Sequence, residues 1–196
     1  MARTRIKPVA SAPWRWAVAG LVLGLAIALP AFLPASWLAE RIVASTGEQV
    51  QLIDPRGTIW SGSARLVLTG GAGSSDAAAL PTRLTWRMRP GLGGLHVALA
   101  SECCTPAPLS FDWRPRWGGA SLRVADGQSQ WPASLLAGLG TPWNTLQLDG
   151  DLLLRTQALS LEWSEGRLAV NGRAEMTAQR VASRVSTLRP LGSYRV

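Results

Sequence analysis

Carboxylates, a histidine and two cysteines are the residues with which this chain could do chemistry. Asp149 and Asp151 lie two positions apart, so on a strand they would point to the same side. Such a pair could bind a hard cation or serve as a general acid and base. A solvated strand face with a bulge at Gly150 explains the same spacing, and we favour this interpretation.

The histidine and the cysteines give a weak case for catalysis. His96 is the only histidine and lies in the alternating stretch "LHVALA", where a surface or hydrogen-bonded role is expected. Cys103 and Cys104 are adjacent, and cysteines of exported proteins normally pair. A disulfide between these neighbours, an intermolecular disulfide and two unpaired thiols are the alternatives. Because no His/Cys cluster has metal-ligand spacing, we predict no catalytic, metal or cofactor site.

The Gly-rich stretch 69–79, "TGGAGSSDAAA", is only superficially similar to a phosphate-binding loop. It lacks the GK[ST] ending, and no strand-to-helix pattern surrounds it. We therefore predict a flexible hairpin loop there.

The positive charge of the chain is not arranged for nucleic acid. The formal net charge is +8 over 196 residues. Arg3, Arg5, Lys7 and Arg15 supply half of this excess at the N-terminus, and the remainder is spread through the predicted strands. A nucleic-acid interface would cluster its basic residues on one face, so we predict no such partner.

An uncharged hydrophobic run covers residues 16–39. About 20 apolar residues span the hydrocarbon core of a bilayer, and the basic residues before the run place the N-terminus in the cytoplasm. We expect a cytoplasmic tail over 1–15, an inner-membrane anchor over 16–38 and an exported domain over 39–196. A signal peptide cleaved near "PAFLPASW" and a buried soluble helix are the alternatives.

Beyond the anchor, the hydrophobic pattern changes to a period of two. Alternation runs through 80–88, 146–154, 159–163 and 168–176, with Gly, Pro, Asp or Ser between the segments. This pattern is typical of antiparallel strands with one wet face. We predict a mainly β fold, a curved antiparallel sheet or sandwich-like domain, with one short helix at 132–140.

A tryptophan followed by glycine recurs before predicted strands, beginning at Trp60, Trp117 and Trp163. The spacings are too unequal for a repeat architecture. We interpret each occurrence as a sharp turn in which the tryptophan fills the core and the glycine takes the bend. The predicted structural residues are Gly57, Trp60, Gly62, Trp163 and Gly166.

Four stretches resemble the type II secretion system protein N family of Gram-negative bacteria. They are "LIDPRGTIWSGSARL" (52–66), "PASLLAGLG" (132–140), "LEWSEGRLAVNGRAEM" (161–176) and "LRPLGSYRV" (188–196). The G-T-x-W-x-G and P-L-G-S-Y-R patterns are the specific parts. Gly192 joins the structural residues because it lies in the last stretch.

The resemblance implies a single-pass inner-membrane protein with a periplasmic domain. Such a protein is an accessory part of the machinery that moves folded exoproteins across the outer membrane, and the family has no known enzymatic activity. Its partners would be other inner-membrane and periplasmic components of that machinery, and self-association is a further expectation. Because members of the family continue beyond the last stretch with more strands, the resemblance implies that the chain is either truncated at Val196 or a short variant.

Two other functions compete with this structural role. A curved sheet rich in Leu and Trp, tethered at the inner membrane, could hold lipids or other hydrophobic ligands. An open apolar groove would favour that function, whereas a fully filled core would exclude it. A hydrolase that uses Asp149 and Asp151 is the other alternative.

Overall fold

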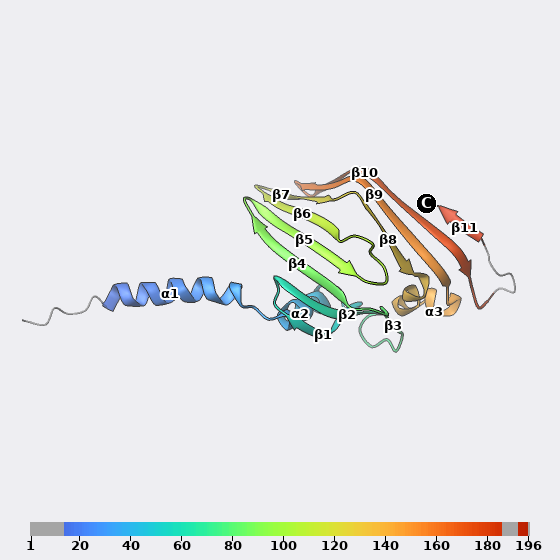
Figure 1. The fold of residues 1–196 in the computed structure, drawn as a ribbon, viewed down its shortest axis with the longest axis horizontal. Coiled ribbons are helices and arrows are strands. Elements are labelled where there is room, and N and C mark those ends of the chain that lie inside the picture. The colour runs from blue at the N-terminus through green and yellow to red at the C-terminus, as the bar shows by residue number, and fades with distance from the viewer. Residues whose placement is uncertain (1–13, 186–191, 196) are drawn as a thin grey trace, which may run out of the picture. The chain divides into compact units, whose positions relative to one another are not determined.

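A computed structural model describes residues 14–185 and 192–195 of the chain (Figure 1). It divides into two compact units, Met1–Leu33 and Pro34–Val196. Most of the predicted cytoplasmic tail lies outside the described residues.

The predicted anchor corresponds to more than one helix. Helix α1 (Trp14–Ala31) is long and apolar enough to cross a membrane by length and composition, as a signal sequence would also be. Helix α2 (Ala35–Ser45) begins after Pro34, which adopts an extended conformation before the first helical residue. The expected boundary at residue 38 therefore falls inside α2, which packs on the sheet of the second unit.

The second unit is built on one antiparallel sheet, which confirms the predicted mainly β fold. Its strands follow the order β1-β2-β4-β5-β6-β7-β9-β10-β11, with β3 beside β2 and β8 beside β9. The strands are β1 (Val50–Gly57), β2 (Ser61–Thr69), β3 (Ala77–Ala79), β4 (Leu84–Gly91), β5 (Gly94–Ser101), β6 (Leu109–Arg116), β7 (Gly119–Val124), β8 (Gly127–Pro132), β9 (Asp149–Ser164), β10 (Arg167–Ala182) and β11 (Gly192–Arg195).

Two buried clusters form the core on one face of this sheet. The first joins α2 to the early strands and contains Ala35, Ala39, Leu52, Ala64 and Trp86. The second contains Leu80, Cys104 and Leu135, and Leu135 comes from η1 (Ala133–Leu139). Leu66 packs against both clusters, so α2 and η1 cover the same face.

Several predicted segments have different bounds in the structure. The predicted short helix is the 3-10 helix η1, which ends at Gly140 as expected. The alternation predicted from residue 146 starts three residues later, at Asp149, because Trp143–Leu146 forms the short helix α3. The predicted loop 69–79 is also shorter, since Ala77–Ala79 pairs with the end of β2 as β3.

Candidate functional site

The "GTIWSG" stretch forms the corner between β1 and β2. The Thr58 N–H donates to the Ser61 carbonyl at 2.9 Å, and the Thr58 hydroxyl accepts from the N–H groups of Trp60 and Ser61 at 3.2 Å. Pro34, at the start of the second unit, forms a β-bridge with Thr58. The corner therefore fastens the entry of the chain to the first hairpin of the sheet.

Both glycines of this corner are required by close contacts. Gly57 has a φ of +90°, a conformation that side chains rarely adopt. Gly62 has no such φ, but a Cβ there would lie 2.5 Å from both the Arg56 carbonyl oxygen and the Trp86 ring. The backbone of β1 and the ring of Trp86 thus occupy the space that a side chain at position 62 would need.

The buried tryptophan at this corner is Trp86 and not Trp60, which corrects the predicted core role of Trp60. Trp60 is only partly buried, whereas Trp86 is 4% exposed. The Trp86 indole N–H donates to the carbonyls of Thr58 and Ile59, both at 3.1 Å. The alternation through 80–88 groups Trp86 with Leu84 and Met88, but the sequence does not reveal that its ring covers a glycine of the neighbouring strand β2.

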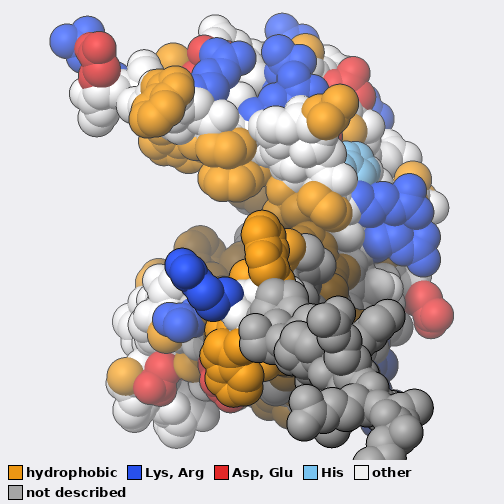
Figure 2. All heavy atoms as spheres, turned by 90° about the vertical axis from the view of Figure 1, so that its left-hand side faces the viewer, with side chains coloured by type: hydrophobic (Ala, Val, Ile, Leu, Met, Phe, Trp, Pro, Cys, Tyr) orange, Lys and Arg blue, Asp and Glu red, His pale blue; other side chains and the backbone are white. Residues whose placement is uncertain are grey.

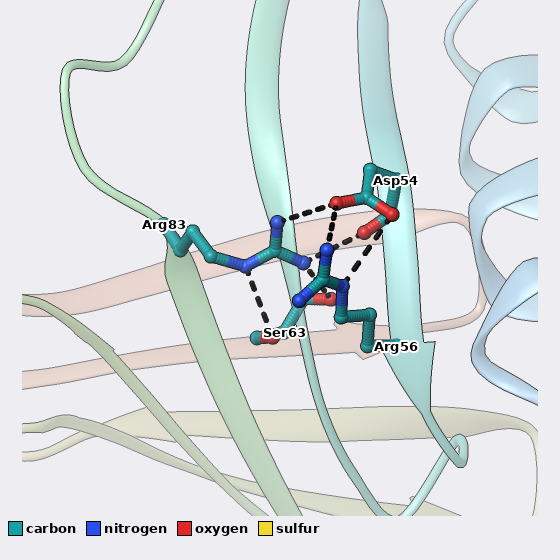
Figure 3. Close-up of polar contacts among 4 residues, drawn as sticks. All are labelled: Asp54, Arg56, Ser63 and Arg83. Carbon is teal, nitrogen blue, oxygen red and sulfur yellow. Dashed lines mark hydrogen bonds and ion pairs between the residues drawn. The ribbon is translucent and has the colours of Figure 1, made fainter.

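A cluster of polar side chains lies at the irregularity in β1, just before the corner (Figure 3). The register of β1 against β2 shifts between Ile53 and Arg56, and Asp54 has a φ of +52°. The Asp54 carboxylate accepts from Arg56 and Arg83, each at 2.9 Å. Arg83 also donates to the backbone carbonyls of Asp54 and Ser63, at 2.7 and 3.1 Å. Hydrogen bonds from Arg56 and then Arg83 lower the pKa of Asp54.

The later Trp-Gly turns are hairpin turns whose tryptophans stay exposed. Gly118 (φ +74°) turns β6 into β7, and Gly166 (φ +74°) turns β9 into β10. Trp117 and Trp163 beside them are 106% and 41% exposed. The glycines take the bends as predicted, but the expected filling of the core by Trp163 is wrong.

The register builds a continuous apolar row across the later strands. Residues directly opposite each other in antiparallel strands share a face of the sheet. Successive partners across β5, β6, β7, β9 and β10 are Leu95, Trp113, Leu122, Leu161 and Val170. One residue further along, the partners are polar: His96, Asp112, Arg123, Ser160 and Asn171. The sheet thus has one apolar face and one polar face.

The apolar face is covered only in part. Leu99, which shares a face with Leu95, packs against the cluster under α2. No member of the apolar row is buried, and Trp113 and Val170 are 43% and 57% exposed. Figure 2 shows hydrophobic side chains along the hollowed underside of the upper part of the molecule, with arginines on its outer side. We call the row and its neighbours Trp163 and Leu168 the open apolar face.

Comparison with known families shows which family the chain belongs to. Residues 48–196 match the profile described as type II secretion system (T2SS), protein N. The chain belongs to this family. The protein N family is one of accessory secretion components and is not known as an enzyme family. Curated proteins and solved structures gave no significant match.

In this protein N family member, the candidate acid and base are engaged in structural contacts. The Asp149 carboxylate accepts from the N–H of Gly150 at 2.9 Å. Asp151 pairs with Arg180, and hydrogen bonds from Gln130 and then Arg180 lower its pKa. A carboxyl with a lowered pKa is a poor general acid near neutrality. His96 pairs with Asp112 at 3.0 Å on the polar face.

The adjacent cysteines of this family member are bonded to each other, with Cys103 exposed and Cys104 buried in the cluster under η1. The Cys104 carbonyl accepts from the N–H of Gln130 at 2.8 Å, which ties this loop to β8. Gly192 lies opposite Val181 in the pair of β10 and β11. These residues hold elements together and do not surround a common site.

Sequence analysis considered an open apolar groove as an alternative but did not identify the residues that form the open apolar face. Alternation covered the parts of this face on β9 and β10, through the segments 159–163 and 168–176, but not Trp113 or Leu122. The number of helices available to cover the sheet could have revealed this face. After α1, the described residues form only the short helical segments α2, η1 and α3, which are too few to cover both ends of a long sheet.

Proposed function

We propose that this protein N family member is an inner-membrane subunit whose periplasmic β domain binds other secretion components through the open apolar face. The N-terminus lies in the cytoplasm and α1 is retained as the anchor. The contacts support the export of folded exoproteins. Family membership supports the secretion role, and the exposure of Trp113 and Val170 supports the choice of surface.

The energetic argument rests on apolar area. Burial of apolar surface contributes about 25 cal/mol per Å², and a row across five strands offers several half-exposed large side chains. Soluble monomers rarely expose contiguous apolar patches of this kind unless a partner or ligand covers them. The polar face carries arginines and hydrogen-bonded pairs, and it offers no comparable area.

Photo-crosslinking in cells tests the surface. A benzophenone amino acid at Trp113 replaces one exposed aromatic ring by another and should capture another secretion component. The same residue at Arg114, the exposed neighbour on the polar face, is the matched control and should capture much less. Equal capture at the two positions would contradict the proposal.

A role in holding acyl chains is the second candidate, favoured by the open state of the apolar face. A fully packed core would have excluded this role, but the side chain of Trp113 is exposed and not packed in a core. The same Trp113 variant separates the two functions, because capture of a phospholipid adds a lipid mass to the protein. Lipid adducts at Trp113 without protein partners would replace the first function by the second.

Protease treatment of spheroplasts tests the topology. With α1 as a retained anchor and the N-terminus in the cytoplasm, the β domain should be degraded in spheroplasts and protected in intact cells. Protection in both would overturn the proposed orientation, and release of the domain from spheroplasts without protease would indicate cleavage of the anchor.

A further inference from the structure

Three hairpin turns of the sheet lie at the same end (Figure 1). Gly91 pairs with Gly94 at the β4–β5 turn, and Arg116 pairs with Gly119 at the β6–β7 turn. The pairing of β5 with β6 places these two turns side by side. Gly119 also pairs with Ser164, the last residue of β9, so the β9–β10 turn lies next to the second hairpin.

The first two turns carry fully exposed apolar side chains. Leu92 and Trp117 are 109% and 106% exposed, more than any other large hydrophobic residue that the structure describes. The bends are made by Gly93 and Gly118, which have φ values of +82° and +74°. Turns favour small or polar residues, and neither Leu92 nor Trp117 packs against the fold. Folding therefore gives no reason for these side chains, whereas an apolar phase outside the protein would.

Unpaired arginines flank both turns. The segments 87–96 and 114–121 contain no acidic residue and four arginines, which are Arg87, Arg89, Arg114 and Arg116. All four are exposed, and none forms an ion pair or a side-chain hydrogen bond within the described part of the chain.

The other turns and connections of the sheet are not basic. The β9–β10 turn carries both signs, with Glu162 and Glu165 beside Arg167. The connections that follow β2, β3, β5, β7 and β8 carry three acidic residues and one arginine. Positive charge is therefore concentrated at the two turns that also expose Leu92 and Trp117.

The chain enters the sheet at this same end. Pro34 forms its β-bridge with Thr58, in the corner between β1 and β2. Ser61, just after that corner, pairs with Arg87, from which β4 runs on to its turn. Helix α1 ends at Ala31, and the three residues from there to Pro34 span at most about 11 Å. A membrane anchor would therefore hold this end of the sheet, and not the end that carries η1, near the bilayer.

We propose that the β4–β5 and β6–β7 turns dock on the bilayer that holds α1. Leu92 and Trp117 enter the interfacial region, and the flanking arginines contact anionic phospholipid headgroups. Indole rings favour the headgroup region, and arginines are attracted to an anionic membrane surface. Because α1 tethers the domain, docking is intramolecular and needs little affinity of its own. The inference rests on the proposed retention of α1 as the anchor.

Docking also sets the position of the open apolar face. The row of this face begins at Leu95, about 10 Å along β5 from Leu92, and continues through its partner Trp113. The row then lies close to the bilayer surface, within reach of a membrane-embedded partner or of a lipid that leaves the bilayer.

Spin-label depth measurements on the full chain test the docking. Leu92→Cys and Trp117→Cys each place a nitroxide at a turn, and Ser75→Cys places one in the exposed connection after β2 as the control. Cys103 and Cys104 are bonded to each other and do not take the label. In nanodiscs of phosphatidylethanolamine and phosphatidylglycerol, oxygen should relax the two turn labels more than a water-soluble nickel chelate does. The order should be reversed for the control label.

Headgroup charge and the arginines supply the second measurement. One arginine near an anionic surface favours the docked state about fivefold, so Arg116→Gln should lower the docked-to-free ratio of the Leu92 label by about this factor. Arg155→Gln, an exposed arginine of β9 far from the turns, is the matched control and should leave the ratio unchanged. Nanodiscs of phosphatidylcholine alone should lower the ratio as Arg116→Gln does. Equal effects of the two substitutions would contradict the arginine contact.

Elution with the nanodiscs separates this inference from the proposed anchor. Full chain that elutes with the discs but keeps both turn labels in water would overturn the docking and leave the anchor standing. Full chain that elutes without the discs would overturn the anchor, and the docking with it. Turn labels that leave the water only when another secretion component is added would make the turns a protein interface and overturn their docking on lipid.

Discussion

The contact between Trp86 and Gly62 shows how one glycine can be fixed by a side chain from another strand. Gly62 lies opposite Trp86 in the pair of β2 and β4, and the indole lies over the glycine. The indole N–H is satisfied by two carbonyls of the corner, so the ring is held in place. Space, and not backbone freedom, is the reason for glycine at this position.

Gly62→Ala should therefore lower the free energy of unfolding by about 1–3 kcal/mol, as overpacking of a filled site does. Thermal or denaturant unfolding measures the loss. Gly91→Ala is the control, since a Cβ there meets nothing within 4 Å and its φ is not positive. Equal stabilities of the two variants would show that both the Trp86 ring and the Arg56 carbonyl can move aside.

Replacement of Trp86 and of Trp60 by alanine should give different losses of stability in the same unfolding measurement. Trp86→Ala removes a 4% exposed side chain and should cost about 3–5 kcal/mol. Trp60→Ala removes a partly buried ring and should cost less. A larger loss for Trp60 would restore the core role that the sequence suggested.

At the scale of the element, the irregularity in β1 depends on charge. Asp54 has a positive φ, and Arg56 and Arg83 close on its carboxylate. The contact is exposed, so salt and solvent screen it. It fixes the path of β1 immediately before the corner and thereby the position of Gly57.

Acid should weaken this contact. The pKa of Asp54 is lowered in the folded chain from its ordinary value of 3.8, so folding favours the ionised form. The stabilisation is full above about pH 4 and is lost as the pH falls through the lowered folded pKa. Melting temperatures of the native chain and Asp54→Asn should differ at pH 6 and converge below that range. A difference in melting temperature that persists in acid would contradict an electrostatic role. Asp151 is present in both chains, so its titration does not contribute to the difference.

Strands with a regular alternation of apolar and polar residues were predictable from the sequence, whereas bulges and shifts of register were not. Alternation identified β4, β9 and β10, and the stretch around His96 identified β5, because these strands place apolar side chains on one side of the sheet. The shift of register beside Gly172 and the positive φ at Ala158 leave no mark in a hydrophobic pattern. Helix α2 was hidden because its first residues continue the uncharged run of α1, and only residues 32–34 separate the two.

At the scale of the molecule, the sheet is longer than the elements that cover it. Helix α2 packs at the early strands and η1 near β2, β3 and β9, while the row from Leu95 to Val170 has no described element over it. The sequence indicated the apolar identity of this face, but coverage depends on where helices dock. The residues of the open apolar face on β9 and β10 were therefore predictable from the sequence, whereas the contributions of Trp113 and Leu122 were not.

If the open apolar face serves a partner and not the fold, polar substitution there should separate function from stability. Leu168→Ser with Val170→Ser removes half-exposed side chains and should cost about 1 kcal/mol or less of unfolding free energy. Secretion of an exoprotein by cells that carry this variant should nevertheless fall. Leu52→Ala, in the buried cluster, is the opposite case and should cost about 2–5 kcal/mol. Normal secretion by the serine variant would contradict the proposal, because it would show that secretion does not need the apolar side chains of this face.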